Sequence, residues 1–208
     1  MVALAVVGSP RDGNTARAAA ELLDGLGGGG TIALPDCRGV EPIADCRACI
    51  AAGACTLRDD FSAVMSRVYE ADPLILATPL YWYGPSAQLK AFLDRWSCLL
   101  DREEDAFRAR MRGKRVVLLV AQGERGFYEA ALCLQQLEWT IRYLDMALVG
   151  RIVVVGHARG DFAADGPQRE AVRAAGRALA AGRPADLQPP WFHMVHQPGA
   201  PLGGVYTP

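Results

Sequence analysis

Runs of apolar residues alternate with amphipathic segments along most of this chain. The apolar runs predict five short buried strands, at residues 2–7, 31–34, 74–78, 115–121 and 151–155. Segments with helical spacing separate the strands, and they predict helices over residues 15–26, 59–70, 85–100, 127–144 and 168–181. Strands that are apolar throughout and alternate with helices are typical of a parallel sheet with helices on both faces.

Right-handed crossover connections leave few ways to order five such strands. We predict an α/β fold of the flavodoxin-like kind, a three-layer sandwich around a five-stranded parallel sheet of order 2-1-3-4-5. In that order a ligand binds beyond the carboxyl ends of the first and third strands, where the strand order reverses. The turns that follow these two strands are therefore expected to carry binding residues.

The turn after the first strand has the composition of a phosphate site. It reads Gly8-Ser-Pro-Arg-Asp-Gly-Asn-Thr15 and leads straight into a predicted helix. Unpaired backbone N–H groups and the positive end of the helix dipole attract a phosphate at such a place. The spacing fits neither the dinucleotide fingerprint nor the Walker motif. A single phosphate held by hydroxyl groups indicates a mononucleotide such as FMN.

The turn after the third strand is unusually aromatic. Thr78-Pro-Leu-Tyr-Trp-Tyr-Gly-Pro-Ser86 places three aromatic residues in succession, where a loop that only turned would be more polar. We expect Tyr81 and Trp82 to flank a flat ring, with backbone groups between Pro79 and Gly84 bonding its edge. The alternative is that the aromatics pack against a helix or a second subunit. The Gly-rich segment at 121–126 would complete the same crevice.

Composition narrows the possible partners. The 208 residues include 22 Lys and Arg against 23 Asp and Glu, which gives no electrostatic case for nucleic acid or an anionic membrane. The apolar runs are too short to span a bilayer, and the N-terminus lacks the basic region of a secretory signal. We therefore expect a cytoplasmic protein with no nucleic-acid or membrane partner.

An ordered set of short motifs resembles one known family. The motifs are Gly8-Ser-Pro-Arg-x-Gly-Asn-Thr15, Gly53-x-Cys55-x3-Asp59-Asp60, Ala71-Asp72, Pro79-x-Tyr81-Trp82 and Ser86-Ala-Gln-Leu-Lys-Ala-Phe-Leu-Asp-Arg95. In this order they are similar to those of the NAD(P)H-dependent FMN reductases, which are flavodoxin-like oxidoreductases with an iron–sulfur flavoprotein branch. The likeness covers residues 1 to about 155 and implies a homodimer or homotetramer with flavin sites near the subunit contacts.

The resemblance also implies a set of cofactor-binding residues. The FMN phosphate would be held by Ser9, Arg11, Asn14 and Thr15. The isoalloxazine ring and ribityl chain would be lined by Pro79, Leu80, Tyr81, Trp82 and Gly84. The third side of the site would be closed by Gln122 and Gly123. Lys90, Asp94 and Arg95 match the family's helix signature, and we interpret them as structural or interfacial.

Four cysteines share the loop after the second strand: Cys37, Cys46, Cys49 and Cys55. The resemblance to the iron–sulfur branch implies a C-x2-C-x2-C segment and a later fourth Cys around a [4Fe–4S] cluster, but Ile43 stands at the first position. Cys37 could supply a fourth thiolate, and four cysteines would also suit zinc or a redox disulfide. We expect ordinary thiols rather than a metal site, and we expect Cys98 and Cys133 to be core thiols.

At 208 residues the chain fits one domain with an extension. We expect an FMN-binding domain at residues 1–184 and a C-terminal arm at residues 185–208. The arm is rich in proline but contains Trp191, Phe192 and Tyr206, whereas a plain disordered tail would be poor in aromatic residues. Our hypothesis is that the arm wraps the partner subunit.

The functional hypothesis is an FMN-dependent oxidoreductase. Hydride from NAD(P)H would reach the bound flavin, and electrons would leave to a small acceptor such as a free flavin or a quinone. The cofactor carries this chemistry, so we expect no catalytic side chain. The alternative is an electron-transfer flavoprotein without nicotinamide reactivity, with or without an iron–sulfur cluster. Carriers of that kind tend to be acidic, and the near-neutral charge of this chain favours the enzyme.

Overall fold

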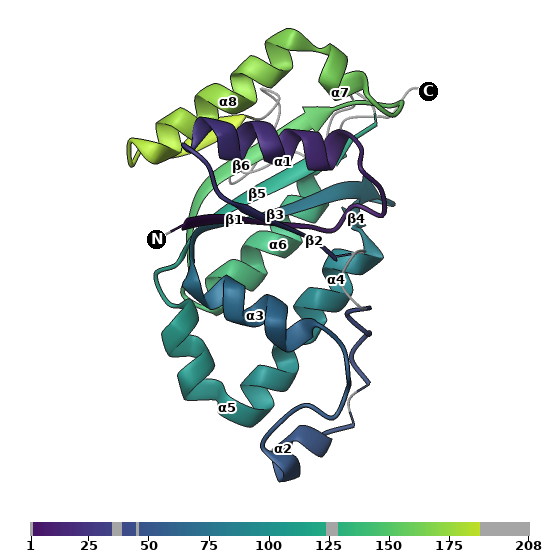
Figure 1. Cartoon of the computed structure of the whole chain (residues 1–208), viewed down its shortest axis with the longest axis vertical. Coiled ribbons are helices and arrows are strands. Elements are labelled where there is room, and N and C mark those ends of the chain that lie inside the picture. Colours follow the sequence, from purple (N-terminus) through teal and green to yellow (C-terminus); the bar gives the residue numbers. More distant parts are fainter. Residues whose placement is uncertain (1, 35–38, 45, 124–128, 188–208) are drawn as a thin grey trace, which may run out of the picture.

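A parallel sheet runs through the middle of the molecule, and helices cover both of its faces (Figure 1). The computed structural model describes residues 2–34, 39–44, 46–123 and 129–187 of the chain. The predicted three-layer α/β sandwich is confirmed within these residues. None of the helices in this described part is both long and apolar enough to cross a membrane.

The sheet has the predicted strand order at its centre and more strands than predicted. Its strands are β2 (Gly30–Ala33), β1 (Val2–Val7), β3 (Ala71–Tyr81), β5 (Arg115–Gln122), β6 (Ala147–Val155) and β7 (Ala185–Leu187), in that spatial order. All of these neighbours pair in parallel. The short strand β4 (Gly84–Pro85) pairs antiparallel with the end of β3.

The prediction of five strands was therefore wrong, although the order of those five is confirmed. β4 and β7 have two and three residues, and so short a segment has no readable period of polar and apolar positions. Residues 185–187, which we assigned to the C-terminal arm, add an edge strand beside β6. The rest of that arm, residues 188–208, lies outside the described residues.

Alternate residues of each central strand face two separate hydrophobic cores. Leu74 and Leu76 of β3 join one core, while Ile75 and Ala77 join the other. The first core is covered by α3 (Phe61–Glu70), α4 (Ala87–Asp94), α5 (Trp96–Met111) and α6 (Ala131–Tyr143). The second is covered by α1 (Asn14–Gly25), α7 (Asp161–Ala164) and α8 (Gly166–Ala180), as Figure 1 shows.

Two glycines set the position of α1. Gly25 of α1 and Gly176 of α8 lie at a crossing so close that a Cβ atom on Gly25 would collide with the backbone of Arg173. A Cβ atom on Gly176 would likewise collide with the backbone of Leu22 and Gly25. The two helices therefore pack backbone to backbone, and this contact fixes the helix that follows the predicted phosphate turn.

The predicted helix over residues 85–100 is divided in the structure. α4 ends at Asp94 and α5 begins at Trp96, with Arg95 between them. The bend carries the Arg95 side chain into the protein, where it is 1% exposed and pairs with Asp59 at 2.5 Å. The sequence pattern missed this break because Arg95 has good helix propensity and only its tertiary partner draws it inward.

The cysteine loop contains one further helix, the short α2 (Ala48–Ala52), which lies beside α5. The sequence analysis treated all of residues 35–58 as loop. Cys37 lies outside the described residues, whereas Cys46, Cys49 and Cys55 lie within them.

Candidate functional site

The turn after β1 and the turn after β3 meet at the carboxyl edge of the sheet. The backbone N–H of Gly8 donates to the carbonyl oxygen of Ala77 at 2.8 Å, and the Ser86 hydroxyl donates to the carbonyl oxygen of Gly8 at 2.5 Å. A Cβ atom on Gly8 would lie 2.7 Å from Ser86 Oγ and 2.7 Å from Leu89 Cβ. Only glycine therefore fits where the first turn crosses the start of α4.

The N-terminus of α1 is open to an anion. Gly13 occupies its N-cap position, no described side chain caps it, and no acidic residue stands in its first turn. The first N–H groups of an α-helix have no partner inside the helix, and the helix dipole makes this end positive. Thr15 is buried at this end, and Ser9 is buried in the turn with its hydroxyl donating to the carbonyl oxygen of Arg11 at 2.7 Å. These are the features of a phosphate site.

The Asn14 side chain is committed to the protein itself. Its amide nitrogen donates to the carbonyl oxygens of Gly156 and Ala158, each at 2.9 Å. Its amide oxygen accepts from the N–H groups of Gly160 and Phe162, at 3.1 and 3.3 Å. These four bonds use the amide fully, so Asn14 ties the loop after β6 to the phosphate turn. A phosphate could meet Asn14 only at its backbone N–H.

The aromatic turn is a two-residue β-hairpin. Leu80 and Tyr81 of β3 pair with Pro85 and Gly84 of β4, which leaves Trp82 and Tyr83 as the central residues. Both have positive φ angles, 49° and 64°, as the tight hairpin turn requires. Residues other than Gly, Asn and Asp rarely adopt this conformation, and such strain is concentrated at functional sites. Trp82 is 95% exposed and projects from the protein.

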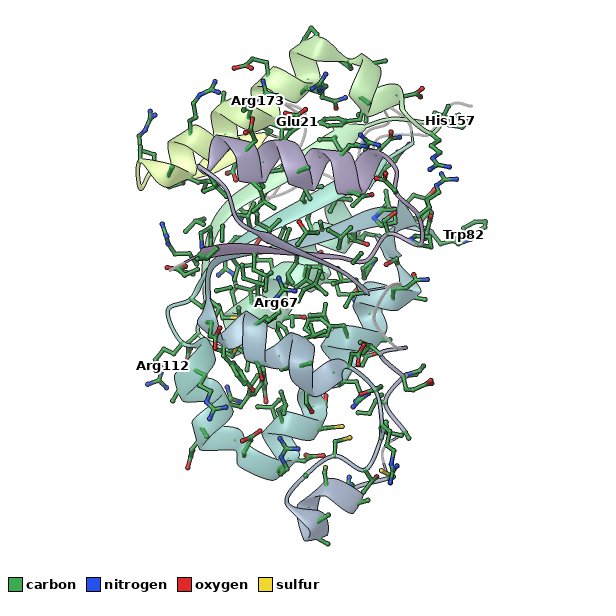
Figure 2. The ribbon with its side chains drawn as sticks, viewed as in Figure 1. Glu21, Arg67, Trp82, Arg112, His157 and Arg173 are labelled. Atoms are coloured by element: carbon green, nitrogen blue, oxygen red, sulfur yellow. The ribbon has the colours of Figure 1, made fainter. Side chains whose placement is uncertain are left out.

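A cavity of about 280 Å³ lies beside this hairpin. Its lining residues are Leu80, Trp82, Tyr83, Gly123, Glu129 and His157. Apart from Glu129, which precedes α6, they come from the ends of β3, β5 and β6, so three neighbouring strands converge on one space. Figure 2 shows Trp82 and His157 projecting at the same end of the molecule.

The structure brings together some of the residues expected at the flavin ring and places others apart. Leu80, Trp82 and Gly123 line the cavity, but Tyr81 does not, because alternate residues of a strand face opposite sides. Pro79 is buried within the sheet opposite Ala121, and Gly84 serves as a hairpin partner. Gln122 is buried, and its carbonyl oxygen accepts from the N–H of Gly156 at 2.9 Å.

Three residues that line the cavity are not in the predicted cofactor-binding set: Tyr83, Glu129 and His157. Tyr83 and His157 carried a usable signal, since one follows β3 and the other follows β6 at the carboxyl edge. Glu129 precedes α6, and nothing in the local sequence pattern distinguishes it from the other carboxylates of the chain.

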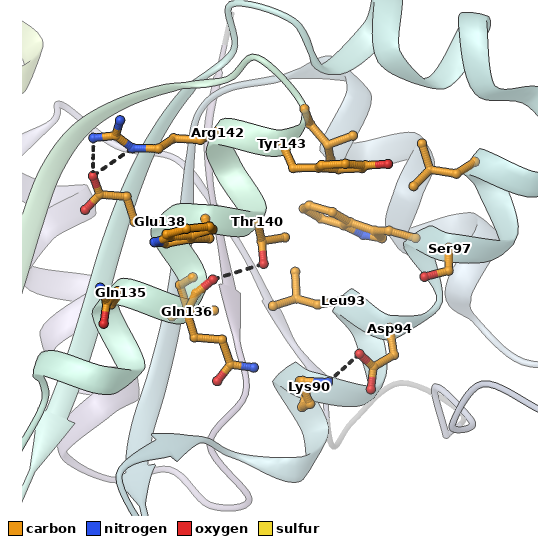
Figure 3. A pocket seen from close by; sticks show the side chains of 15 residues that line it. Lys90, Leu93, Asp94, Ser97, Gln135, Gln136, Glu138, Thr140, Arg142 and Tyr143 are labelled. Carbon is orange, nitrogen blue, oxygen red and sulfur yellow. Dashed lines mark hydrogen bonds and ion pairs between the residues drawn. The ribbon is translucent and has the colours of Figure 1, made fainter.

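A larger cavity lies elsewhere in the described part of the chain. It has a volume of about 970 Å³ and opens between α6 and the α4–α5 segment (Figure 3). Its wall includes Leu93 and Trp96 on one side and Trp139 and Tyr143 on the other. Trp139 is 70% exposed, which is unusual for a tryptophan on an unpartnered surface. Because none of its lining residues lines the cavity beside the hairpin, this groove is separate from the candidate cofactor site.

The structure describes three of the four loop cysteines, Cys46, Cys49 and Cys55. Within the described residues, no three His, Cys, Asp or Glu side chains are placed to hold one metal ion. The five described cysteines are free thiols. Cys133 is buried in the core as expected, and burial raises its pKa to about 12. Cys98 differs from expectation, since it is partly exposed and faces the loop cysteines. Burial also raises the pKa of Cys98, against the opposing effect of Arg95.

A buried ion pair anchors this loop to the helices. Arg95 binds the Asp59 carboxylate and donates to the carbonyl oxygen of Glu41 at 3.1 Å. Burial alone would raise the pKa of Asp59, but hydrogen bonds from Arg95 and from the N–H groups of Glu41 and Phe61 outweigh it and lower that pKa. Asp59 also caps α3 through Phe61, so the same carboxylate holds a helix start and a cationic partner.

Comparison with known proteins identifies the family of this chain. The sequence profile of the NADPH-dependent FMN reductases matches residues 1–160. The chain is 31% identical over 141 residues to the putative NAD(P)H-dependent FMN-containing oxidoreductase YwqN of Bacillus subtilis, covering 67% of this chain and 76% of YwqN. It is 36% identical over 100 residues to the iron–sulfur flavoprotein MJ1083 of Methanocaldococcus jannaschii, covering 46% of this chain and 51% of that protein.

Solved structures share the fold. The Trp repressor binding protein from Bacillus subtilis superposes with a TM-score of 0.64 at 24% identity, covering 83% of this chain and 96% of that one. An NADH:FMN oxidoreductase, EMOB, superposes with a TM-score of 0.61 at 20% identity, covering 88% and 90%. The flavodoxin-like fold is thereby confirmed. The profile match and the relatedness to YwqN show that the chain belongs to the NADPH-dependent FMN reductase family and is an NAD(P)H-dependent FMN oxidoreductase.

Proposed function

We propose that FMN binds at the carboxyl edge of the sheet, with its phosphate at the start of α1 and its ring beside the Trp82–Tyr83 hairpin. The observation that carries this proposal is the Ser86–Gly8 hydrogen bond, which holds the open helix N-terminus and the aromatic hairpin in one site. FMN has a flat ring joined to a phosphate by a short chain, so it can reach both the N-terminus of α1 and the aromatic hairpin at this edge of the sheet.

The phosphate is held by backbone N–H groups at the start of α1 together with Ser9, Arg11 and Thr15. Ser9 and Thr15 are buried beside these groups, while Arg11 is exposed at the rim and adds positive charge. Asn14 acts as a positioning residue, because its side chain holds the loop after β6 in place.

The ring side of the site is formed by Leu80, Trp82, Tyr83 and Gly123. Tyr81, Pro79 and Gly84 support the hairpin through β-pairing, and Gln122 holds the end of β5. His157 lines the same cavity, next to the position where a Cβ atom on Gly123 would lie. Glycine at 123 therefore keeps space open between the end of β5 and His157.

FMN, when bound, supplies the chemistry of accepting hydride from NAD(P)H and passing electrons onward. The protein's part is to hold the phosphate, orient the ring and leave one face accessible. The exposure of Trp82 at the cavity mouth suits an acceptor that is small and arrives from solvent, such as a free flavin or a quinone. The second candidate, an electron carrier without nicotinamide reactivity, has no observation in its favour.

The proposal includes a homodimer or homotetramer in the cytoplasm. Trp139 and Tyr143 are exposed on α6 beside the large groove, and apolar surface of this kind is typical of subunit contacts. The described cysteines are all free thiols, as is usual in a reducing compartment. Light scattering of the purified chain, with Trp139→Glu as the disrupting variant, tests the assembly.

The cofactor assignment is tested by titrating flavin-free protein with FMN and following the quenching of flavin fluorescence. We expect Arg11→Ala to weaken FMN binding about tenfold or more, as loss of a charge-assisted hydrogen bond does. Arg112→Ala is the matched control, because Arg112 is exposed at the far end of the molecule (Figure 2). Equal affinity of the Arg11 and Arg112 variants would contradict the phosphate site.

The activity is tested by mixing the FMN-loaded protein with NADPH or NADH under anaerobic conditions. For a reductase we expect rapid loss of the flavin absorbance, followed by its return when a quinone or free flavin is added. Trp82→Ala is expected to change the rate of one of these two half-reactions without changing stability, because Trp82 is almost fully exposed. If the flavin stays oxidised with both NADPH and NADH, the result would contradict the reductase and favour an electron carrier without nicotinamide reactivity.

A further inference from the structure

In the structure Cys98 of α5 lies beside the cysteine loop. The sequence did not indicate that Cys98 would be a neighbour of this loop. A small cavity of about 20 Å³ lies between the loop and α5. Four cysteines are among its lining residues: Cys46, Cys49, Cys55 and Cys98. The cavity has room for about one water molecule, so the residues that line it lie close together, with Cys49 buried, Cys55 and Cys98 partly exposed and Cys46 exposed.

Cys55 and Cys98 also share a second, larger cavity. It has a volume of about 230 Å³, lies between α3 and α5, and is lined by both cysteines and by charged residues such as Arg102 and Glu103. Only three residues, Cys55, Arg95 and Cys98, line both cavities. These three therefore form the wall between them, with the two thiols on a route that a small polar molecule could enter.

Arg95 distinguishes the two thiols. Its Nη2 atom donates to Cys55 Sγ at 3.3 Å while its Nη1 atom binds Asp59. The guanidinium therefore places a positive charge and an N–H donor directly against the Cys55 sulfur, which is the reacting atom in thiol chemistry. Among the described residues no guanidinium bond of this kind reaches Cys98, which lies one turn along the helix from Arg95 and lines the same cavity. Cys55 therefore has a cationic hydrogen-bond donor, and Cys98 lines the same cavity beside it.

The geometry does not favour a metal centre, because no three ligating side chains in the described part of the chain are placed to hold one metal ion. Two thiols, however, are enough for a covalent bond. Cys55 stands after the end of α2, outside any helix or strand, so its backbone can adjust to the strict geometry of a disulfide.

We propose that Cys55 and Cys98 are a thiol pair that hydroperoxides oxidise to a disulfide. The Cys55 sulfur attacks the outer oxygen of the hydroperoxide, the O–O bond breaks, a sulfenic acid forms on Cys55, and the alcohol (water, for hydrogen peroxide) leaves. The Cys98 sulfur then attacks the Cys55 sulfur and displaces the hydroxyl group, which leaves as water with the Cys98 proton. The two thiols lose two electrons and two protons in total, and the hydroperoxide gains them.

The disulfide would join the loop to α5 beside the Arg95–Asp59 ion pair. Such a bond closes a loop of the chain between residues 55 and 98. Thiol pairs of this kind in a reducing compartment are transient and respond to oxidants, so the site is one of reversible modification and not a structural staple.

The test uses the purified full chain with FMN bound. The protein is treated with hydrogen peroxide, free thiols are blocked with N-ethylmaleimide, and the unreduced protein is digested with trypsin for mass spectrometry. Cleavage after Arg47, Arg58, Arg95 and Arg102 leaves Cys98 in peptide 96–102, and Cys49 and Cys55 together in peptide 48–58. We expect these two peptides to be joined by a bond that dithiothreitol breaks, with the loss of two free thiols per chain.

Serine variants identify the partners. The crosslink is expected to persist in Cys49→Ser and to disappear in both Cys55→Ser and Cys98→Ser. In Cys98→Ser, Cys55 is expected to remain as a sulfenic acid that dimedone traps. Cys133→Ser is the matched control, because Cys133 is buried in the core away from the loop and its removal should leave the crosslink unchanged.

Two results would overturn the proposal. One is a wild-type protein in which peptides 48–58 and 96–102 stay separate while peroxide oxidises other cysteines. The other is metal analysis that finds stoichiometric zinc or iron released by thiol blocking, since bound metal would make these thiols ligands. The wild-type measurement needs no variant to fold, and neither result bears on FMN binding.

Discussion

Ser86 Oγ donates a 2.5 Å hydrogen bond to the carbonyl oxygen of Gly8, and this bond joins two turns that are 78 residues apart in the chain. The same hydroxyl accepts from the N–H of Leu89 at 3.2 Å and so caps α4. The Ser86 N–H in turn donates to Thr78 Oγ1 at 2.9 Å. One buried serine therefore fixes the phosphate turn, the aromatic hairpin and the start of a helix relative to one another.

Replacing Ser86 with Ala is expected to lower both stability and FMN affinity. The loss of a cap and of a buried hydrogen bond costs about 1–3 kcal/mol of unfolding free energy, and the two turns lose their link. Urea unfolding of the flavin-free protein and FMN titration measure the two effects. Ser97→Ala is the control, because Ser97 is exposed on α5 and its loss should change stability by less than about 0.5 kcal/mol. A Ser86→Ala protein with wild-type values in both assays would refute the linking role.

Replacing Asn14 with Ala is expected to loosen the loop after β6. Four hydrogen bonds to this loop would be lost, at a cost of about 2–4 kcal/mol in unfolding free energy. Hydrogen exchange should accelerate at the amides of Gly160 and Phe162, which lose their acceptor. Gln136→Ala, an exposed amide on α6, is the comparison. Unchanged exchange at residues 160 and 162 would show that the loop holds its shape without Asn14.

The Asp59–Arg95 pair predicts a dependence of stability on pH. Because the pKa of Asp59 is lowered in the folded state, its contribution is complete above the unfolded pKa of about 3.9 and is lost as the pH falls through the folded pKa. Asp59→Asn leaves Arg95 buried without its counterion, which costs about 3–5 kcal/mol at pH 7. Urea unfolding at pH 7 and at a series of values below pH 4 should show the wild-type advantage shrinking on acidification.

The control for this pH dependence is Asp94→Asn. Asp94 forms a surface pair with Lys90, and both side chains are well exposed, so its loss should cost no more than about 1 kcal/mol. A difference between wild type and Asp59→Asn that stays constant down to pH 3 would contradict the lowered pKa.

Replacing Gly25 with Ala is expected to be strongly destabilising. The new methyl group would meet the backbone of Arg173, which cannot move aside as a flexible side chain can. Separation of α1 from α8 would cost about 3 kcal/mol or more and displace the phosphate turn at the other end of α1. Gly166→Ala is the matched control in α8, since nothing lies within 4 Å of its added methyl group. Equal thermal unfolding of the two variants would disprove the close crossing.

Much of the fold could be predicted because it depends on local patterns. The apolar runs of β1, β3 and β5 are long enough to be read one strand at a time, and the handedness of crossovers then restricts their order. β4 and β7 escaped prediction because each is defined by its pairing with a neighbour and not by its own composition. The break at Arg95 escaped for a related reason, since its cause is Asp59, 36 residues away.

The two turns that the sequence singled out meet in the structure, but only some of the residues named in them line the cavity beside the hairpin. Consecutive residues of the aromatic turn look alike in the sequence, but the hairpin directs Trp82 and Tyr83 to the cavity and leaves Tyr81 in the β-pair. Asn14 has the residue type of a phosphate ligand, yet its four hydrogen bonds make it a support for the loop after β6. Side-chain direction and competing partners exist only in three dimensions.

The sequence by itself determined the family and the layered fold and indicated the edge of the sheet where we propose that the cofactor binds, because strand periodicity and turn composition are local properties. Only the tertiary structure decided which side chains meet. It placed Ser86 on Gly8, turned Arg95 inward to Asp59, and set Cys98 beside Cys55 across 43 residues of chain. Contacts between distant segments depend on how helices and strands pack, and no local pattern records them.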